Sequence, residues 1–278
     1  MTRKFSAWTA LVLIMALLAG CGQMRGILNV DPHAEFDRRY DDLKNQQPSP
    51  ARDAALLQLA RDANEEAGST RDTKDKINFH SRAATYAWAA NTEEALIQVI
   101  LSADAGYRLC QSFPDEQRKP GRDCALLAAY GPVASGESAL SQIETSKPDS
   151  PTTTVVNMDS LRAIDGHAER FKGVVVRQWP TAEAAIAAPE VPEDTAAWFA
   201  ESKRRQWCRF YWITNQAKRW KLDPSTRAAS RQVRTRIAGH YDAVFAAGKD
   251  RIGVDSPNAA FNLCAPYAQP SQPSVPAL

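Results

Sequence analysis

The sequence predicts an all-α protein in which helical hairpins or a small bundle are joined by disulfide bonds. Apolar residues recur every three or four positions over several long stretches, as they do on one face of an α-helix. Residues that favour helix starts and stops, such as Asp, Asn, Gly and Pro, lie between these stretches. Four cysteines fall inside or beside the helical stretches, namely Cys110, Cys124, Cys208 and Cys264.

Residues 51–146 are predicted to form an N-terminal helical region. The first helix has apolar residues at three- and four-residue steps from Leu56 to Ala67, and it is expected to stop near Gly68. A second helix over residues 72–90 and a third after it show the same spacing. A loop with two prolines follows, and a fourth helix is expected to begin near Asp123.

Four small or aromatic residues in the second of these helices suggest a repeat. Ala83, Ala84, Ala87 and Trp88, followed by a further helix, resemble tetratricopeptide-type repeats. The resemblance implies paired, stacked helices. No period of about 34 residues recurs along the chain, so helical hairpins of the ordinary kind are the alternative.

Residues 147–192 are predicted to be a connector with one helix, over residues 160–171. The segments on either side of that helix are rich in β-branched residues, so they could form a minor two-strand element around residues 152–179 or merely extend the helix. A lone pair of strands is only marginally stable, which favours helix and loop. Residues 180–192 are rich in Ala and Pro and are expected to link the two helical regions.

Residues 193–264 are predicted to form a basic, aromatic C-terminal helical region, and residues 265–278 a disordered Pro-rich tail. One helix is expected over residues 195–221 and another after Pro224. The first is apolar on more than one face, which is typical of a helix that packs on several neighbours or exposes aromatic residues to a partner. The candidate partner-binding residues are Lys203, Arg204 and Arg205 on the first helix and Arg227, Arg231 and Arg234 on an outer stripe of the second.

The first 20 residues have the pattern of a cleavable export signal. Arg3 and Lys4 are followed by an apolar stretch that ends at Leu18. This stretch is shorter than the ~20 residues that a membrane-spanning helix needs. We therefore expect residues 1–20 to be removed, after which Cys21 begins the mature chain.

The Leu18-Ala19-Gly20-Cys21 sequence resembles the lipobox of bacterial lipoproteins, and this resemblance covers residues 1–21 only. It implies that Cys21 carries acyl chains, palmitate among them. Because the residues after Cys21 are polar and charged, residues 21–50 are expected to form a lipidated flexible tether, in which a short helix between Asp31 and Leu43 is possible. Two or more acyl chains hold a protein on a membrane, whereas one is marginal. Gly22, in place of the Asp that favours inner-membrane retention in this class, implies the periplasmic face of the outer membrane. The alternative is a plain secretory signal with an incidental cysteine.

Export also bears on the remaining four cysteines, because cysteines of exported chains usually pair. Three pairings are possible, and Cys110–Cys124 with Cys208–Cys264 is favoured. In the chain-entropy account the first bond is worth about 3 kcal/mol and the second roughly 4 kcal/mol. No pair of cysteines has the C-x-x-C spacing of a zinc site, so no metal is expected.

The charges are unevenly distributed along the chain. Residues 31–107 carry 14 acidic and 9 basic side chains, whereas residues 193–253 carry 6 acidic and 13 basic ones. An exported lipoprotein does not routinely meet nucleic acid, so the basic region favours an acidic envelope protein, lipid phosphates or an anionic cell-wall partner. A solvated helical surface is the alternative.

The sequence contains no convincing catalytic motif. Gly136-Glu137-Ser138 lacks the second glycine of a nucleophile elbow and follows no buried strand. His167 lies two positions from Asp165 and from Glu169, so on a helix it faces away from both carboxylates, and a solvated helix surface is expected there. No catalytic residue and no cofactor are predicted.

The sequence therefore favours a membrane-anchored binding or scaffold module in cell-envelope assembly. Lipid on Cys21 would fix its location, and helix faces would contact partners. The alternatives are a periplasmic cell-wall hydrolase with a carboxylate site, and a purely structural envelope protein. A hydrolase would need two acidic side chains that face each other in a deep cleft.

Overall fold

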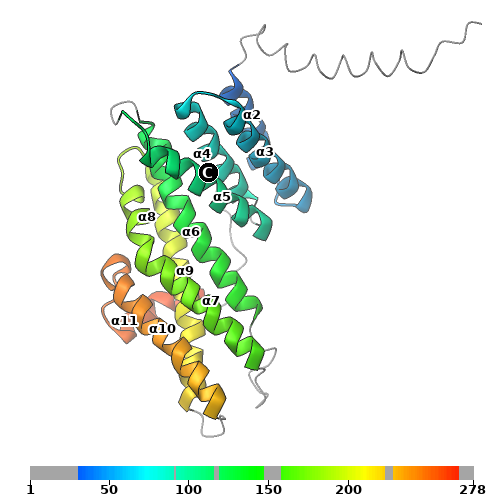
Figure 1. The fold of residues 1–278 in the computed structure, drawn as a ribbon. Coiled ribbons are helices and arrows are strands. Elements are labelled where there is room, and N and C mark those ends of the chain that lie inside the picture. The colour runs from blue at the N-terminus through cyan, green and yellow to red at the C-terminus, as the bar shows by residue number, and fades with distance from the viewer. Residues whose placement is uncertain (1–30, 91, 116–118, 147–157, 223–227, 269–278) are drawn as a thin grey trace, which may run out of the picture. The chain divides into compact units, whose positions relative to one another are not determined.

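The computed structural model describes residues 31–90, 92–115, 119–146, 158–222 and 228–268, with the backbone alone described for 216–222. Within these ranges the chain forms ten α-helices, one short 3₁₀ helix and no strand, which confirms the predicted all-α fold class (Figure 1). None of these helices combines the length and the apolar character that a membrane span requires. The chain divides into two compact units, residues 1–45 and 46–278.

The described part of the first unit is one helix, α2 (Pro32–Lys44). Asp31 caps its start, since the Asp31 side chain accepts a hydrogen bond of 2.9 Å from the backbone N–H of His33. Pro32 stands in the first turn, where its missing N–H costs nothing. The short helix that the sequence allows between Asp31 and Leu43, inside the predicted tether, is thus present.

The second unit begins with four helices, each packed on the next: α3 (Pro50–Ser69), α4 (Thr73–Ala89), α5 (Glu93–Gln111) and α6 (Gly121–Thr145). A side chain caps each of the first three, from Ser49, Asp72 and Thr92. Gly106 of α5 lets the helices approach closely, because a Cβ there would lie 2.7 Å from the Leu127 side chain.

A polar network crosses the first three of these helices. The Nδ1 atom of His80 lies 2.8 Å from Oδ1 of Asn64, and the Asn64 amide donates to Ser102 Oγ at 2.8 Å. Burial, and secondly the charge of Lys76, lowers the pKa of His80. His80 therefore resists protonation in the folded state, and the network fixes the register of the hairpins.

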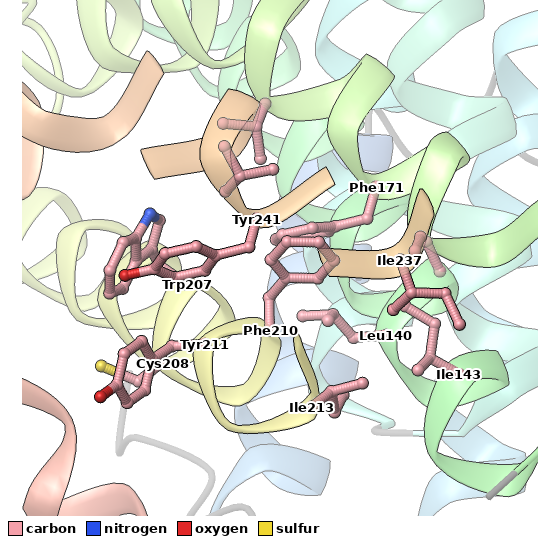
Figure 2. Packing of buried hydrophobic residues seen from close by; sticks show 14 of the residues in the cluster. Leu140, Ile143, Phe171, Trp207, Cys208, Phe210, Tyr211, Ile213, Ile237 and Tyr241 are labelled. Carbon is pink, nitrogen blue, oxygen red and sulfur yellow. The ribbon is translucent and has the colours of Figure 1, made fainter. Parts of the chain in front are cut away.

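The long helix α6 continues into a second group of helices: α7 (Met158–Arg177), α8 (Trp179–Ile186), α9 (Glu193–Leu222), α10 (Ala228–Ile252) and α11 (Pro257–Cys264). Their largest buried side chains meet around Phe171 and Phe210, whose ring centroids are 4.7 Å apart (Figure 2). Leu140 and Ile143 of α6 and Ile237 of α10 belong to the same cluster. The second core thus joins α6, α7, α9 and α10.

The prediction that residues 180–192 are only a link is wrong, whereas of the two alternatives for the β-branched run after Gly173, extension of the helix is the one observed. The β-branched run after Gly173 completes α7, and the segment after it forms α8, which packs on α6. Trp179 is fully buried, so this segment belongs to the core. The other half of the proposed strand pair, residues 152–156, lies outside the described residues.

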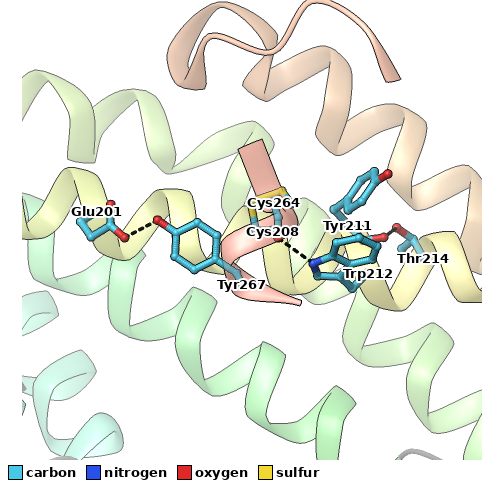
Figure 3. The surroundings of a disulfide bond; sticks show 7 residues. All are labelled: Glu201, Cys208, Tyr211, Trp212, Thr214, Cys264 and Tyr267. Atoms are coloured by element: carbon cyan, nitrogen blue, oxygen red, sulfur yellow. Dashed lines mark hydrogen bonds between the residues drawn. A yellow bond between two sulfur atoms is a disulfide. The ribbon is translucent and has the colours of Figure 1, made fainter. Parts of the chain in front are cut away.

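Both favoured disulfides are present, Cys110–Cys124 and Cys208–Cys264, which confirms their predicted pairing. The first joins the end of α5 to the start of α6. The second joins the middle of α9 to the end of α11 (Figure 3). The first residues of the predicted disordered tail are instead folded onto the protein. Residues 265–267 form a 3₁₀ turn, and the Tyr267 hydroxyl donates a hydrogen bond to Glu201. The rest of the predicted disordered tail, residues 269–278, lies outside the described residues.

Candidate binding groove

A groove with a volume of about 290 Å³ lies where α5, α6 and the start of α8 meet. Its walls are mostly apolar, with Ile100 and Tyr107 on α5 and Leu127 on α6. Ser135, Gln178 and Thr181 supply uncharged polar groups. The volume is near the lower limit of small-molecule sites, which suits a few apolar side chains of a partner.

The groove exists because the wall formed by α6 is made of small residues. Gly131 and Pro132 are adjacent in the helix, and both line the groove. A Cβ added to Gly131 would meet only the Ala103 Cβ, at an ordinary contact distance of 3.6 Å. Pro132 has no N–H to offer the carbonyl of Ala128, so the helix lacks one of its hydrogen bonds at this wall.

The groove is apolar at its edge and electrically neutral inside. Leu101 lines it while remaining 59 % exposed, and Ile97, one turn earlier on α5, is 51 % exposed. Asp104 is the charged residue of the lining, and its carboxylate accepts hydrogen bonds of 3.2 and 2.5 Å from Arg108. An uncharged apolar segment is therefore the ligand that fits this lining with the least desolvation cost.

The six basic residues predicted to bind a partner do not form one exposed face. Lys203 is buried, and its amino group donates to Glu183 of α8 at 2.8 Å. Burial lowers the pKa of Lys203, and the bond to Glu183 opposes that shift. Arg234 is only 6 % exposed, so the prediction that it lies on an outer stripe is wrong.

Three of the other four basic residues are more accessible, two of them on α9 and one on α10. Arg204 pairs with Glu201 at 2.6 Å on the same helix, and Arg205 has a buried Nε atom without a described partner. Arg231 is exposed, and Arg227 lies outside the described residues. The physical reason is that α9 packs against α6, α8, α10 and α11, so most of its faces are internal.

One titratable cluster was missed by the sequence analysis. His240 of α10 lies between two carboxylates of α7, with its Nε2 atom 3.1 Å from Asp165 and its Nδ1 atom 3.1 Å from Glu169. Arg236 also donates to Asp165, at 2.9 Å. The expectation of a solvated helix surface at Asp165 is wrong, because its side chain is only 17 % exposed.

The His240 cluster joins two helices. Both ring nitrogens of His240 contact a carboxylate of α7, so the cluster ties α10 to α7. A signal for the contact was present in the sequence. Asp165 and Glu169 are four residues apart on one helix, and Arg236 and His240 are four apart on another, so each pair shares a face.

Two carboxylates of α6, those of Glu137 and Glu144, are held by one arginine. Arg209 of α9 donates to Glu137 and to both oxygens of Glu144, the latter at 3.0 and 2.7 Å. Burial alone would lower the pKa of Arg209, but the hydrogen bonds and charges of the two glutamates raise it overall. The arrangement links α6 to α9, and a general acid or base would first have to leave this ion pair.

Within the described ranges, no group of three or more His, Cys, Asp or Glu side chains is placed to hold a metal ion. Comparisons of the chain with protein-family models, with curated proteins and with solved structures found no match. The groove between α5 and α6 is thus a candidate site for binding another molecule.

Proposed function

We propose that this chain is a lipoprotein held by acyl chains on Cys21 at the periplasmic face of the outer membrane, where it acts as a scaffold in envelope assembly. Its α5–α6 groove binds an uncharged apolar segment of another envelope protein. The observation that supports this most directly is the neutral apolar groove, on a chain whose first 21 residues resemble a lipoprotein signal.

The size of the groove sets the strength of the contact. Burial of two large apolar side chains contributes about 3–6 kcal/mol, before the cost of association is subtracted. Such a contact is weak between proteins that are free in solution. A lipid tether confines the chain to the membrane surface and raises its effective concentration near a membrane-bound partner, so a weak contact is occupied for much of the time.

Cys21→Ser tests the anchor. We expect the variant to lack acyl chains and to move from the membrane fraction to the soluble fraction, because no other residue in the signal can carry a thioether-linked lipid. Mass spectrometry of the purified full chain and fractionation of cell envelopes provide the measurements. An unmodified Cys21 in the wild-type protein would remove the anchor from the proposal.

Gly131→Leu tests the groove. A Cβ at this position has room, since its nearest neighbour would be the Ala103 Cβ at 3.6 Å, and the rest of the leucine side chain is expected to extend into the groove and fill it. Leucine also favours a helix over glycine, so the free energy of unfolding is expected to stay equal or to rise by up to about 1 kcal/mol.

The binding measurement uses a photo-crosslinking residue at Ser135 inside the groove and, as a control, at Phe261, which is 50 % exposed on α11. Position 135 is expected to yield an adduct with one defined protein, and Gly131→Leu to abolish it. An adduct of equal yield from position 261, or one that survives Gly131→Leu, would show that the groove is not the binding site.

A further inference from the structure

The surface of α5 that points away from the core carries a self-complementary pattern. The outer strip of α5 is defined here as Glu94, Ile97, Gln98, Leu101, Asp104, Ala105 and Arg108. Its central residue, Leu101, is 59 % exposed. The side chains at its two ends are more exposed still, Glu94 at 67 % and Arg108 at 74 %. A large apolar side chain exposed between opposite charges is typical of a contact surface.

The positions of these residues are symmetric about Leu101. Seven residues make almost two turns of an α-helix, so Glu94, Leu101 and Arg108 lie on one line along the surface. Ile97 and Ala105 lie four residues before and after Leu101, on opposite sides of that line. Gln98 and Asp104 lie three residues before and after it, again on opposite sides.

We propose that α5 pairs with α5 of a second copy of this chain, antiparallel, about a two-fold axis through Leu101. In such a pair each residue faces the one at the equal and opposite distance from the axis. Leu101 packs on Leu101, and Ile97 on the small Ala105. Every contact occurs twice, and each joins groups of compatible chemistry.

The charges favour this arrangement over other occupants of the strip. Glu94 of each copy faces Arg108 of the other, and the Gln98 amide faces the Asp104 carboxylate. Within one chain Glu94 already pairs with Arg61, and Asp104 with Arg108. The two-fold contact joins these exposed pairs into rows of alternating charge, which is more favourable than isolated pairs. A strip with charge of one sign would have repelled its own copy.

The contact involves one helix from each copy, so we infer a dimer that forms and dissociates with concentration rather than a permanent one. It does not depend on lipid attachment or on the groove residues Gly131 and Ser135. Loss of the anchor, or loss of groove binding in Gly131→Leu, would therefore leave the dimer intact. Leu101 and Asp104 belong to both the strip and the groove lining, so the second copy and a groove ligand would compete. Glu94 and Arg108 lie outside the groove lining, so substitutions there report on the dimer separately.

Charge reversal provides the first test, by sedimentation of the purified full chain in detergent. Glu94→Arg and Arg108→Glu are each expected to weaken the dimer by about tenfold, because each places like charges opposite one another twice. An equimolar mixture of these two variants is expected to restore it. In the mixed pair the introduced arginine of one chain faces the introduced glutamate of the other, and the unchanged Arg108 faces the unchanged Glu94.

Glu93→Arg is the matched control, with the same change of charge at a neighbouring position outside the strip; it is expected to leave the dimer unchanged. A wild-type chain that stays monomeric over the whole concentration range would overturn the proposal. The proposal would also be overturned if the equimolar mixture of Glu94→Arg and Arg108→Glu contained no larger fraction of dimer than either variant alone.

Crosslinking provides the second test. Leu101→Cys places two thiols on the axis, so oxidation of the purified protein is expected to give a band of twice the monomer mass on a non-reducing gel. Phe261→Cys, at a side chain of similar exposure on α11, is the control and is expected to remain monomeric. Equal yields from the two positions would contradict the two-fold contact, and unchanged thermal unfolding of each variant checks the fold.

Discussion

Replacement of Cys208 and Cys264 together with alanine is expected to lower the free energy of unfolding by about 4 kcal/mol in the chain-entropy account. The bond closes a loop with a sequence separation of 56, so its loss gives the unfolded chain considerably more freedom. Both sulfur atoms belong to fully buried residues, and the variant also loses packing there. Urea unfolding followed by circular dichroism measures the change.

The other disulfide provides the matched comparison. Cys110 and Cys124 are separated by 14 positions, so their replacement is expected to cost about 3 kcal/mol, less than the first pair. A reversed order of the two losses would show that native packing, rather than loop closure, determines what each bond contributes. Near-UV circular dichroism is expected to change more for the first pair, since Trp212 donates to the Cys264 carbonyl at 3.1 Å (Figure 3).

The helical architecture was predictable because its signals are local. Apolar residues at helical spacing identified α3 and α9, and the cysteine positions identified the two bonds that join helices. The one helix that sequence reasoning missed inside the connector, α8, begins with Trp179 and Pro180. A segment rich in Ala and Pro predicts a link, although proline in the first turn of a helix is favoured. Burial of Trp179 depends on α6 and could not follow from the local sequence.

For the charged residues, ion pairs within one helix could be predicted from the sequence, whereas ion pairs between helices could not. The pair Glu201–Arg204 is three residues apart on one helix and follows from spacing alone. Lys203 pairs with Glu183, which is on another helix, so its burial depends on tertiary packing. Sequence periodicity does not assign a basic residue to solvent on a helix that packs on several sides, because each face of that helix meets a different neighbour.

The groove could not be predicted, because its lining comes from three separate helices. A proline inside a helical stretch, Pro132, was the local hint, since it marks a place where the helix lacks a hydrogen bond. The outer strip of α5 is different, because its symmetry about Leu101 is visible in the sequence once the helix is known. What the sequence lacks is the exposure of Leu101, which shows that no described neighbour covers it.

Arg209→Met is expected to lower the free energy of unfolding by about 2–3 kcal/mol, which is below the loss for a fully buried ion pair because the partners are partly solvated. The arginine side chain is 18 % exposed, and those of Glu137 and Glu144 are 29 % and 35 % exposed. Methionine keeps much of the apolar volume but leaves two carboxylates of α6, those of Glu137 and Glu144, without the guanidinium that pairs with both. Urea unfolding at neutral pH measures the loss.

The control for Arg209→Met removes the charges that the substitution leaves unpaired. In the triple variant that adds Glu137→Gln and Glu144→Gln, we expect most of the loss to be recovered, because amides cost less to bury than unpaired carboxylates. Gln206 remains able to donate to the Val133 carbonyl, as it does at 2.8 Å in the wild-type chain. A triple variant as unstable as the single one would mean that the guanidinium stabilises α9 through packing, and that the ion pairs contribute little to the contact of α9 with α6.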